Sequence, residues 1–179
     1  MKKQQLDHLL RAAGRITKDK QFVIVGSQSL HGKQPDLPDQ LLVSLEADLI
    51  AKNHPERTSW LEAIGVGSRF HDEFGYYADP VDEHTAVLPK GWQGRLVNLP
   101  GGDTGGVTGL CLDPHDLAIS KYVANREKDR VFLQAMIVRK VIDQDRLLAL
   151  LDTTPMTAAA RKSIRLRIQT GFAHRGKPA

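Results

Sequence analysis

The stretch that decides the fold is "QLLVSLEADLIAK", residues 40–52, in which two carboxylates stand two positions apart among aliphatic side chains. Successive residues of a β-strand point to opposite faces of the sheet, so Glu46 and Asp48 share one face. The alternation predicts a strand over residues 41–51. One face of this strand carries Ser44, Glu46 and Asp48, and the other carries Val43, Leu45, Ala47 and Leu49.

The carboxylate face has two interpretations. It is either the solvated side of a half-exposed sheet, where polar and apolar residues alternate in any case, or a cation site. Proteins commonly hold Mg²⁺ with one or two carboxylates, completed by water and by phosphates of the substrate. Glu46 and Asp48 are therefore candidate metal ligands.

A second decisive stretch is "QFVIVGSQSLHG", residues 21–32, which predicts a buried strand over 21–26 followed by a short helix over 27–31. Glycine lets the backbone approach a phosphate closely, and a serine at a helix start favours an anion. Gly26-Ser27 is therefore a candidate phosphate cradle, although a tight turn after a strand explains the same pair. The polar segment 32–39, with two prolines, predicts a loop.

The remaining pattern predicts an α+β fold, with helices packed on a sheet. Further strands are predicted at 74–77, 85–88, 95–99 and 108–112, and a loop at the glycine-rich segment 101–106. Helices are predicted at 6–13 (with a stop at Gly14), 55–64, 114–124, 127–141, 144–151 and 157–169. We expect an α+β core over residues 1–112 and a helical region over 113–179, packed together as one compact domain.

Composition bounds the function. The 179 residues are 41% hydrophobic and carry a formal net charge of +4, which permits a nucleic-acid or nucleotide partner without requiring one. The lone Cys111 excludes an internal disulfide and a cysteine metal cage. We see no signal peptide or membrane span and expect a cytoplasmic protein. From Arg161 to Lys177 there are six cations and no carboxylate, which suits either phosphate contacts or a solvated basic helix.

The order of strand, Gly-Ser, spacer and acid-x-acid strand resembles the minimal nucleotidyltransferase fold of the DNA polymerase β-like superfamily. The match here is Gly26-Ser27 followed by Glu46-Ala47-Asp48. A second match, "LDPHDLAISKYVANREKDRVFL" at residues 112–133, resembles the C-terminal signature of small bacterial nucleotidyltransferase-like proteins of uncharacterised or toxin–antitoxin type. The matching positions are Asp116, Leu117, Lys121, Ala124, Arg126, Lys128 and Asp129.

The resemblance implies roles for seven residues. Gly26 and Ser27 would contact nucleotide phosphates, and Glu46 and Asp48 would hold Mg²⁺. Lys121 and Arg126 would bind the nucleotide, Lys121 by stabilising charge on the leaving group, and Asp129 would lie near the same site. The implied activity is Mg²⁺-dependent nucleotidyl transfer from a nucleoside triphosphate to an RNA end or a protein side chain, with an antitoxin-like protein as partner. The alternative is a catalytically degraded binding module of the same fold.

Two departures from the family pattern stand out. Eighteen residues separate Ser27 from Glu46, and the first acid is Glu where the family usually has Asp. Active members carry a third acid on a later strand, for which Asp103 and Asp129 are the candidates.

Plainer roles are also open for several of these residues. Asp116 suits the cap of a helix start, Lys121 suits a snorkelling side chain, and Arg126 suits a solvated turn with local ion pairs. The histidine- and acid-rich segment 67–84 matches no zinc-ligand spacing, so we expect structural or surface roles for it.

Overall fold

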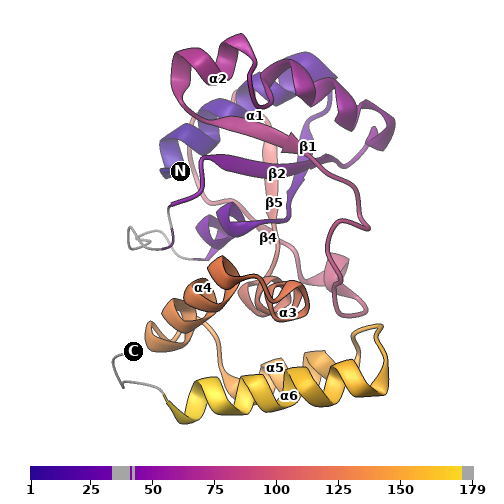
Figure 1. Cartoon of the computed structure of the whole chain (residues 1–179). Coiled ribbons are helices and arrows are strands. Elements are labelled where there is room, and N and C mark those ends of the chain that lie inside the picture. The colour runs from indigo at the N-terminus through magenta and orange to yellow at the C-terminus, as the bar shows by residue number, and fades with distance from the viewer. Residues whose placement is uncertain (34–40, 42, 175–179) are drawn as a thin grey trace. The chain divides into compact units, whose positions relative to one another are not determined.

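The computed structural model describes residues 1–33, 41 and 43–174, and the chain forms two compact units (Figure 1). The first unit contains Met1–Thr85 and Leu96–Asp113, and the second contains Ala86–Arg95 and the chain from Pro114 onward. The segment Ala86–Arg95 thus joins the helical unit, although it lies within the range 1–112. Strands and helices are mixed in the first unit, so the predicted α+β class is confirmed.

The first unit is built on one five-stranded mixed sheet of order β3-β2-β1-β5-β4. Its strands are β1 (Gln21–Ile24), β2 (Glu46–Ala51), β3 (Tyr77–Pro80), β4 (Val97–Asn98) and β5 (Thr108–Cys111). The central strand β1 is antiparallel to β2 and parallel to β5, while β2 and β3 are parallel and β4 and β5 antiparallel. This mixed sheet agrees with the nucleotidyltransferase-like fold expected from the sequence.

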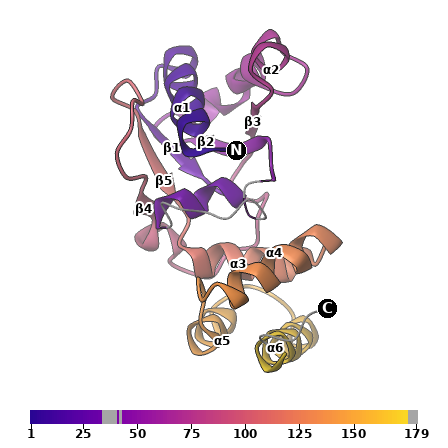
Figure 2. The same ribbon diagram turned by 90° about the vertical axis from the view of Figure 1, so that its left-hand side faces the viewer.

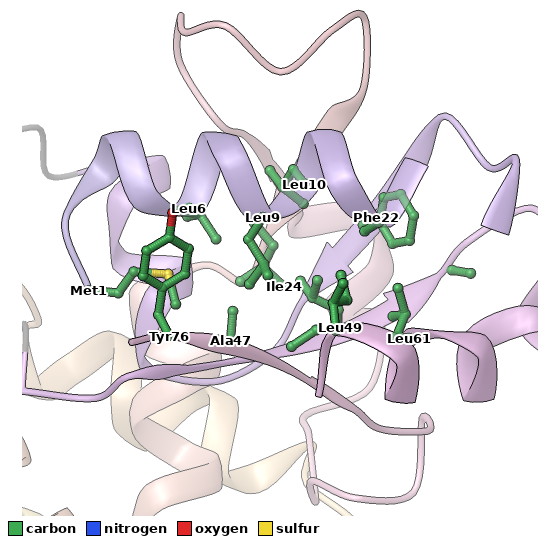
Figure 3. Packing of buried hydrophobic residues seen from close by; sticks show 14 of the residues in the cluster. Met1, Leu6, Leu9, Leu10, Phe22, Ile24, Ala47, Leu49, Leu61 and Tyr76 are labelled. Carbon is green, nitrogen blue, oxygen red and sulfur yellow. The ribbon is translucent and has the colours of Figure 1, made fainter. Parts of the chain in front are cut away.

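One face of the sheet is covered by helix α1 (Lys3–Thr17) (Figure 2). The leucines of this helix point at the sheet, where Leu9 and Leu10 lie beside Ile24 and Leu49 in one buried cluster (Figure 3). The predicted stop at Gly14 is wrong, because α1 continues to Thr17. Gly14 instead permits close packing, since a Cβ there would lie 2.5 Å from a methyl carbon of Val107.

Short elements connect the strands, and several differ from the sequence prediction. They are the 3₁₀ helices η1 (Ser27–Gly32), η3 (Pro55–Ile64) and η4 (Trp92–Arg95), and the helix α2 (Arg69–Phe74). The strand predicted over 41–51 begins only at Glu46, and the strand predicted at 85–88 is not formed. Residues 34–39 of the predicted loop, and position 42, lie outside the described residues.

The second unit contains four α-helices. They are α3 (Pro114–Ala124), α4 (Glu127–Val138), α5 (Gln144–Asp152) and α6 (Ala158–Ala173), with α5 packed along α6 (Figures 1 and 2). Asn125 adopts a left-handed φ of 52° between α3 and α4, which confirms the predicted break. Arg95 binds the buried Asp116 of α3 with two hydrogen bonds of 2.8 and 2.7 Å. Within the described part of the chain, no helix combines the length and apolar character that a membrane crossing requires.

Candidate active site

The carboxylates of β2 lie on the face of the sheet opposite α1. Ala47 and Leu49 are fully buried in the cluster beneath the helix, whereas Glu46 and Asp48 are half-buried. The predicted alternation is therefore confirmed within the strand. Val43 and Leu45 do not continue its apolar face, because they precede the strand and are 76% and 52% exposed.

The Gly-Ser turn lies directly against the second carboxylate. A Cβ added at Gly26 would lie 1.6 Å from Oδ2 of Asp48 and 2.7 Å from its Cγ. The φ of Gly26 is −81°, so glycine is required here for space and not for backbone conformation. The backbone N–H of Val25 also donates to the carbonyl oxygen of Asp48 at 3.1 Å. Ser27, half-buried, begins η1 immediately after this contact.

A third carboxylate lies across the strand pair. In the parallel register of β2 and β3, Asp79 is the partner of Asp48, and Tyr77 is the partner of Glu46. Side chains at paired positions share a face, and the Tyr77 hydroxyl donates to Oε2 of Glu46 at 3.2 Å. Sequence reasoning missed Asp79, because β3 was predicted three residues too early, at 74–77.

The two candidates named for a third acid have other surroundings. Asp103 lies in the glycine-rich loop and pairs with Arg11 of α1, the helix on the other face of the sheet. Asp129 lies in the second unit, in the first turn of α4. Asp79 is thus the additional carboxylate that this sheet presents beside Glu46 and Asp48.

The carboxylate face concentrates negative charge. Burial and the neighbouring charge of Glu46 raise the pKa of Asp79 above its ordinary value. Burial is also the main cause that raises the pKa of Tyr77. The charge of Glu46, the hydrogen bond to Glu46, and the charges of Asp79 and Asp48 raise it further. Like charges disfavour one another's ionised forms, so a cation bound at this face would relieve the repulsion.

The donor chemistry fits a magnesium ion held by two carboxylates. Among residues 1–33, 41 and 43–174, no three or more His, Cys, Asp or Glu side chains converge on a single metal position. Glu46 and Asp48 supply hard oxygen donors, and Mg²⁺ usually completes its shell with water and substrate phosphates. Asp48 Oδ2 occupies the space that a Cβ at position 26 would need, so this carboxylate lies directly against the Gly26-Ser27 turn.

The predicted downstream residues form a network of their own in the second unit. Asp129 is fully buried and accepts from Lys121 Nζ at 3.2 Å and from Arg126 Nε at 2.7 Å. The Lys121 ammonium also lies 4.3 Å from the ring centre of Phe132. Burial alone would raise the pKa of Asp129, but the hydrogen bond from Arg126 and the charge of Lys121 hold it below its ordinary value. These three residues therefore lie together within the second unit.

Ser68 and His71, in the histidine- and acid-rich segment 67–84, take part in local structure. Ser68 caps α2 by accepting from the backbone N–H of His71 at 3.2 Å. The His71 ring stands edge-on to Tyr77 with centres 4.7 Å apart, and its Nδ1 accepts from the Gly67 N–H. His71 thus packs against the tyrosine that donates to Glu46. No residue spacing in the sequence predicts this contact.

Comparison with known families finds one matching family. Residues 3–174 match the model of a family described as "Nucleotidyltransferase of unknown function (DUF6036)". The chain belongs to this family. No curated protein and no solved structure matches the chain. The matched residues extend over both units.

Proposed function

We propose that the protein transfers a nucleotidyl group from a nucleoside triphosphate to an acceptor in a Mg²⁺-dependent reaction. The observation that carries this proposal is the contact of Gly26 with Asp48, which joins a Gly-Ser turn to an acid pair on one open face of the sheet. Membership in a nucleotidyltransferase family supports the reaction class. We ascribe the protein to the DNA polymerase β-like superfamily, because its Gly-Ser pair is followed by Glu-x-Asp.

In this mechanism Glu46 and Asp48 would hold the ion. When bound, Mg²⁺ supplies charge neutralisation and orientation of the phosphates. Gly26 and Ser27 would contact the phosphates through backbone N–H groups and the serine hydroxyl. The acceptor hydroxyl would attack the α-phosphorus, the bond to the β-phosphate oxygen would break, and pyrophosphate would leave. Asp79, a carboxyl whose pKa is raised, would accept the proton of the hydroxyl.

The acceptor we propose is an RNA end or a protein side chain, and the partner an antitoxin-like protein, both on the resemblance to toxin–antitoxin members. Lys121 and Arg126 would contribute positive charge toward the nucleotide, with Asp129 holding them. A second candidate function is a binding module with a degraded site. It is favoured by one observation, namely that Lys121 is already held by Asp129 and packed on Phe132.

The test is transfer of label from each of the four α-labelled nucleoside triphosphates to total RNA or to protein, with and without Mg²⁺. The wild type should transfer label only with Mg²⁺, and Asp48→Asn should lose at least about 100-fold in rate, as when one essential charged group is removed from a transition state. Asp72→Asn, an exposed acid of α2, is the matched control. Transfer that persists in Asp48→Asn would overturn the role of Asp48, and no transfer by the wild type with any substrate would favour the binding module.

A further inference from the structure

A pocket opens in the first unit at the C-terminal end of α1, away from the carboxylate face. Its lining includes Gly14, Arg15, Lys18, Lys20, Gly105 and Val107. Because α1 packs on the sheet face opposite Glu46 and Asp48, the pocket is distinct from the candidate active site. None of these lining residues has a role in the proposed transfer reaction.

The walls of the pocket are fixed by contacts between α1 and the glycine-rich loop 101–106. Lys3 Nζ donates to the Gly101 carbonyl at 2.6 Å, and Arg11 Nη1 donates to the Asp103 carbonyl at 2.7 Å. Gly105 has a φ of 63°, and a Cβ there would lie 3.2 Å from Cγ of Arg11. The loop therefore lies tight against the helix along its length, which gives the pocket a defined wall.

Two acids lie at the pocket: Asp19 belongs to its lining, and Asp103 lies in the loop beside it. Asp19 accepts from the backbone N–H groups of Gln21, Asn53 and His54 and from the Asn53 amide, at 2.7 to 3.0 Å. Burial would raise the pKa of Asp19, but these hydrogen bonds hold it below its ordinary value. Asp103 is paired with Arg11. Asp19 therefore stays ionised, and among the described residues neither carboxylate forms an ion pair with Arg15, Lys18 or Lys20.

Two carbonyl groups at the helix end, which would ordinarily repel an anion, accept hydrogen bonds. The Gly14 carbonyl accepts from the Lys18 N–H at 3.0 Å, and the Thr17 carbonyl accepts from Arg57 Nη1 at 3.1 Å. The cations Arg15, Lys18 and Lys20 are exposed and form no ion pair within the described part of the chain. The lining thus presents the exposed cations Arg15, Lys18 and Lys20 against the single negative charge of Asp19, beside glycines and Val107.

We propose that this pocket binds phosphate groups of single-stranded nucleic acid, with one base on the floor formed by Gly105 and Val107. Cations along a groove track the phosphate backbone, and an arginine guanidinium contributes a cation–π contact with a base. Three separate cations suit successive phosphates of a strand. A free nucleotide offers the same phosphate-and-base chemistry, so the experiment includes it as a separate probe.

The test measures fluorescence anisotropy of a labelled 12-nucleotide single-stranded RNA with the full chain. The variant Arg15→Gln/Lys18→Gln/Lys20→Gln should bind at least about 10-fold more weakly, and its salt slope should fall by about 2, at roughly 0.7 per lost phosphate contact. The control Arg69→Gln/Lys90→Gln/Arg139→Gln removes the same charge at exposed positions elsewhere. Competition by a nucleoside monophosphate distinguishes the two sources: displacement at micromolar concentration identifies a free nucleotide as the ligand, and displacement only by oligonucleotide identifies a strand.

A second measurement needs no variant. Acetylation of surface amines, followed by mass spectrometry, should show Lys18 and Lys20 protected by the oligonucleotide and Lys90 unprotected. Equal weakening in both triple variants, equal reactivity with and without RNA, or no binding of either probe would overturn the proposal. Asp48→Asn should bind the oligonucleotide like the wild type, so failure of the transfer reaction and failure of this site are separable.

Discussion

Gly26 and Asp48 are packed so closely that no side chain fits at position 26 while the carboxylate keeps its place. The two residues lie on adjacent antiparallel strands or their ends, joined by the hydrogen bond from the Val25 N–H to the Asp48 carbonyl. The contact therefore couples the turn after β1 to the acid pair of β2. A long spacer between the two motifs does not prevent it, because strand pairing sets the distance.

Gly26→Ala should displace the Asp48 carboxylate. The new Cβ would overlap both Cγ and Oδ2 of Asp48. The aspartate side chain is short, so it can avoid the overlap only by changing its rotamer. We expect a loss of about 1–3 kcal/mol in the free energy of unfolding, as for other overpacked sites. Thermal melts with and without Mg²⁺ measure this effect. The Mg²⁺-dependent stabilisation, about 1.4 kcal/mol at ten times the Kd, should also disappear.

Gly94→Ala is the control for this substitution, since a Cβ at Gly94 would meet no atom within 4 Å. That variant should melt within about 0.5 kcal/mol of the wild type. An unchanged response of Gly26→Ala to Mg²⁺ would show that the Asp48 carboxylate does not bind the ion.

Asp79→Asn should stabilise the protein at neutral pH. The pKa of Asp79 is raised in the folded state by burial and by Glu46, so the native state binds its proton more tightly than the unfolded state does. Stability then falls as the pH rises from the ordinary pKa toward the raised one, and the ionised form is disfavoured above it. Because Asp79 is only partly buried and solvent screens its charge, the gain should stay below about 1 kcal/mol.

Urea melts of Asp79→Asn and the wild type at pH 7 and pH 3 measure that difference. The gain should be present at pH 7 and absent at pH 3, where Asp79 is protonated in both states. Asp72→Asn, also exposed, should show no gain at either pH. Destabilisation by Asp79→Asn at pH 7 would contradict the repulsion from Glu46.

Local signals predicted much of the fold. The Asp113-Pro114 start and the left-handed Asn125 bound α3 at the residues expected, and period-2 alternation predicted which face of β2 carries Glu46 and Asp48. Helix α2 was missed because its short sequence is mostly polar. Its two ends nonetheless carry local signals, namely the capping residue Ser68 and Gly75, whose φ is 74°.

The parts that sequence reasoning missed depend on tertiary pairing. Asp79 becomes part of the site only through the parallel register of β3 with β2, which packing decides and no local pattern encodes. The strand predicted upstream of Glu46 failed for a related reason. The backbone N–H of Tyr77 donates to the Leu45 carbonyl, at the point where the pairing of β2 with β3 begins. Val43 has no partner strand among the described residues and stays exposed.

Cys111 should be unreactive in the native protein. It is fully buried in the core cluster, and burial raises the pKa of its thiol to about 12. Thiolate is the reactive form, so a disulfide reagent at pH 8 should modify Cys111 only as fast as the first unit opens. The modification rate should rise to that of a free thiol in denaturant, and rapid native modification would contradict the burial.

The Lys121–Asp129 pair should contribute more to the free energy of unfolding than an exposed ion pair does. Asp129→Asn removes a fully buried carboxylate that holds the largely buried Lys121 and the exposed Arg126, and breaking a buried pair costs about 3–5 kcal/mol. Since the pKa of Asp129 is lowered in the folded state, its contribution is present above the ordinary value of 3.8 and is lost as the pH falls through the folded pKa. Urea melts at pH 7 and pH 3 should therefore show the cost of Asp129→Asn at pH 7 and a smaller one at pH 3.

A double-mutant cycle with Lys121→Met separates a structural ion pair from a lysine kept for a nucleotide. If the pair stabilises the fold, the coupling free energy should be about 1–3 kcal/mol, and Glu127→Gln, an exposed neighbour on α4, should couple to Lys121→Met by less than about 0.5 kcal/mol. A coupling near zero, together with a lost transfer rate in Lys121→Met, would assign the lysine to the nucleotide alone. A large coupling with an equally lost rate is what we expect, because an ammonium fixed by Asp129 and Phe132 is held in one position, and a fixed charge stabilises a leaving group better than a mobile one.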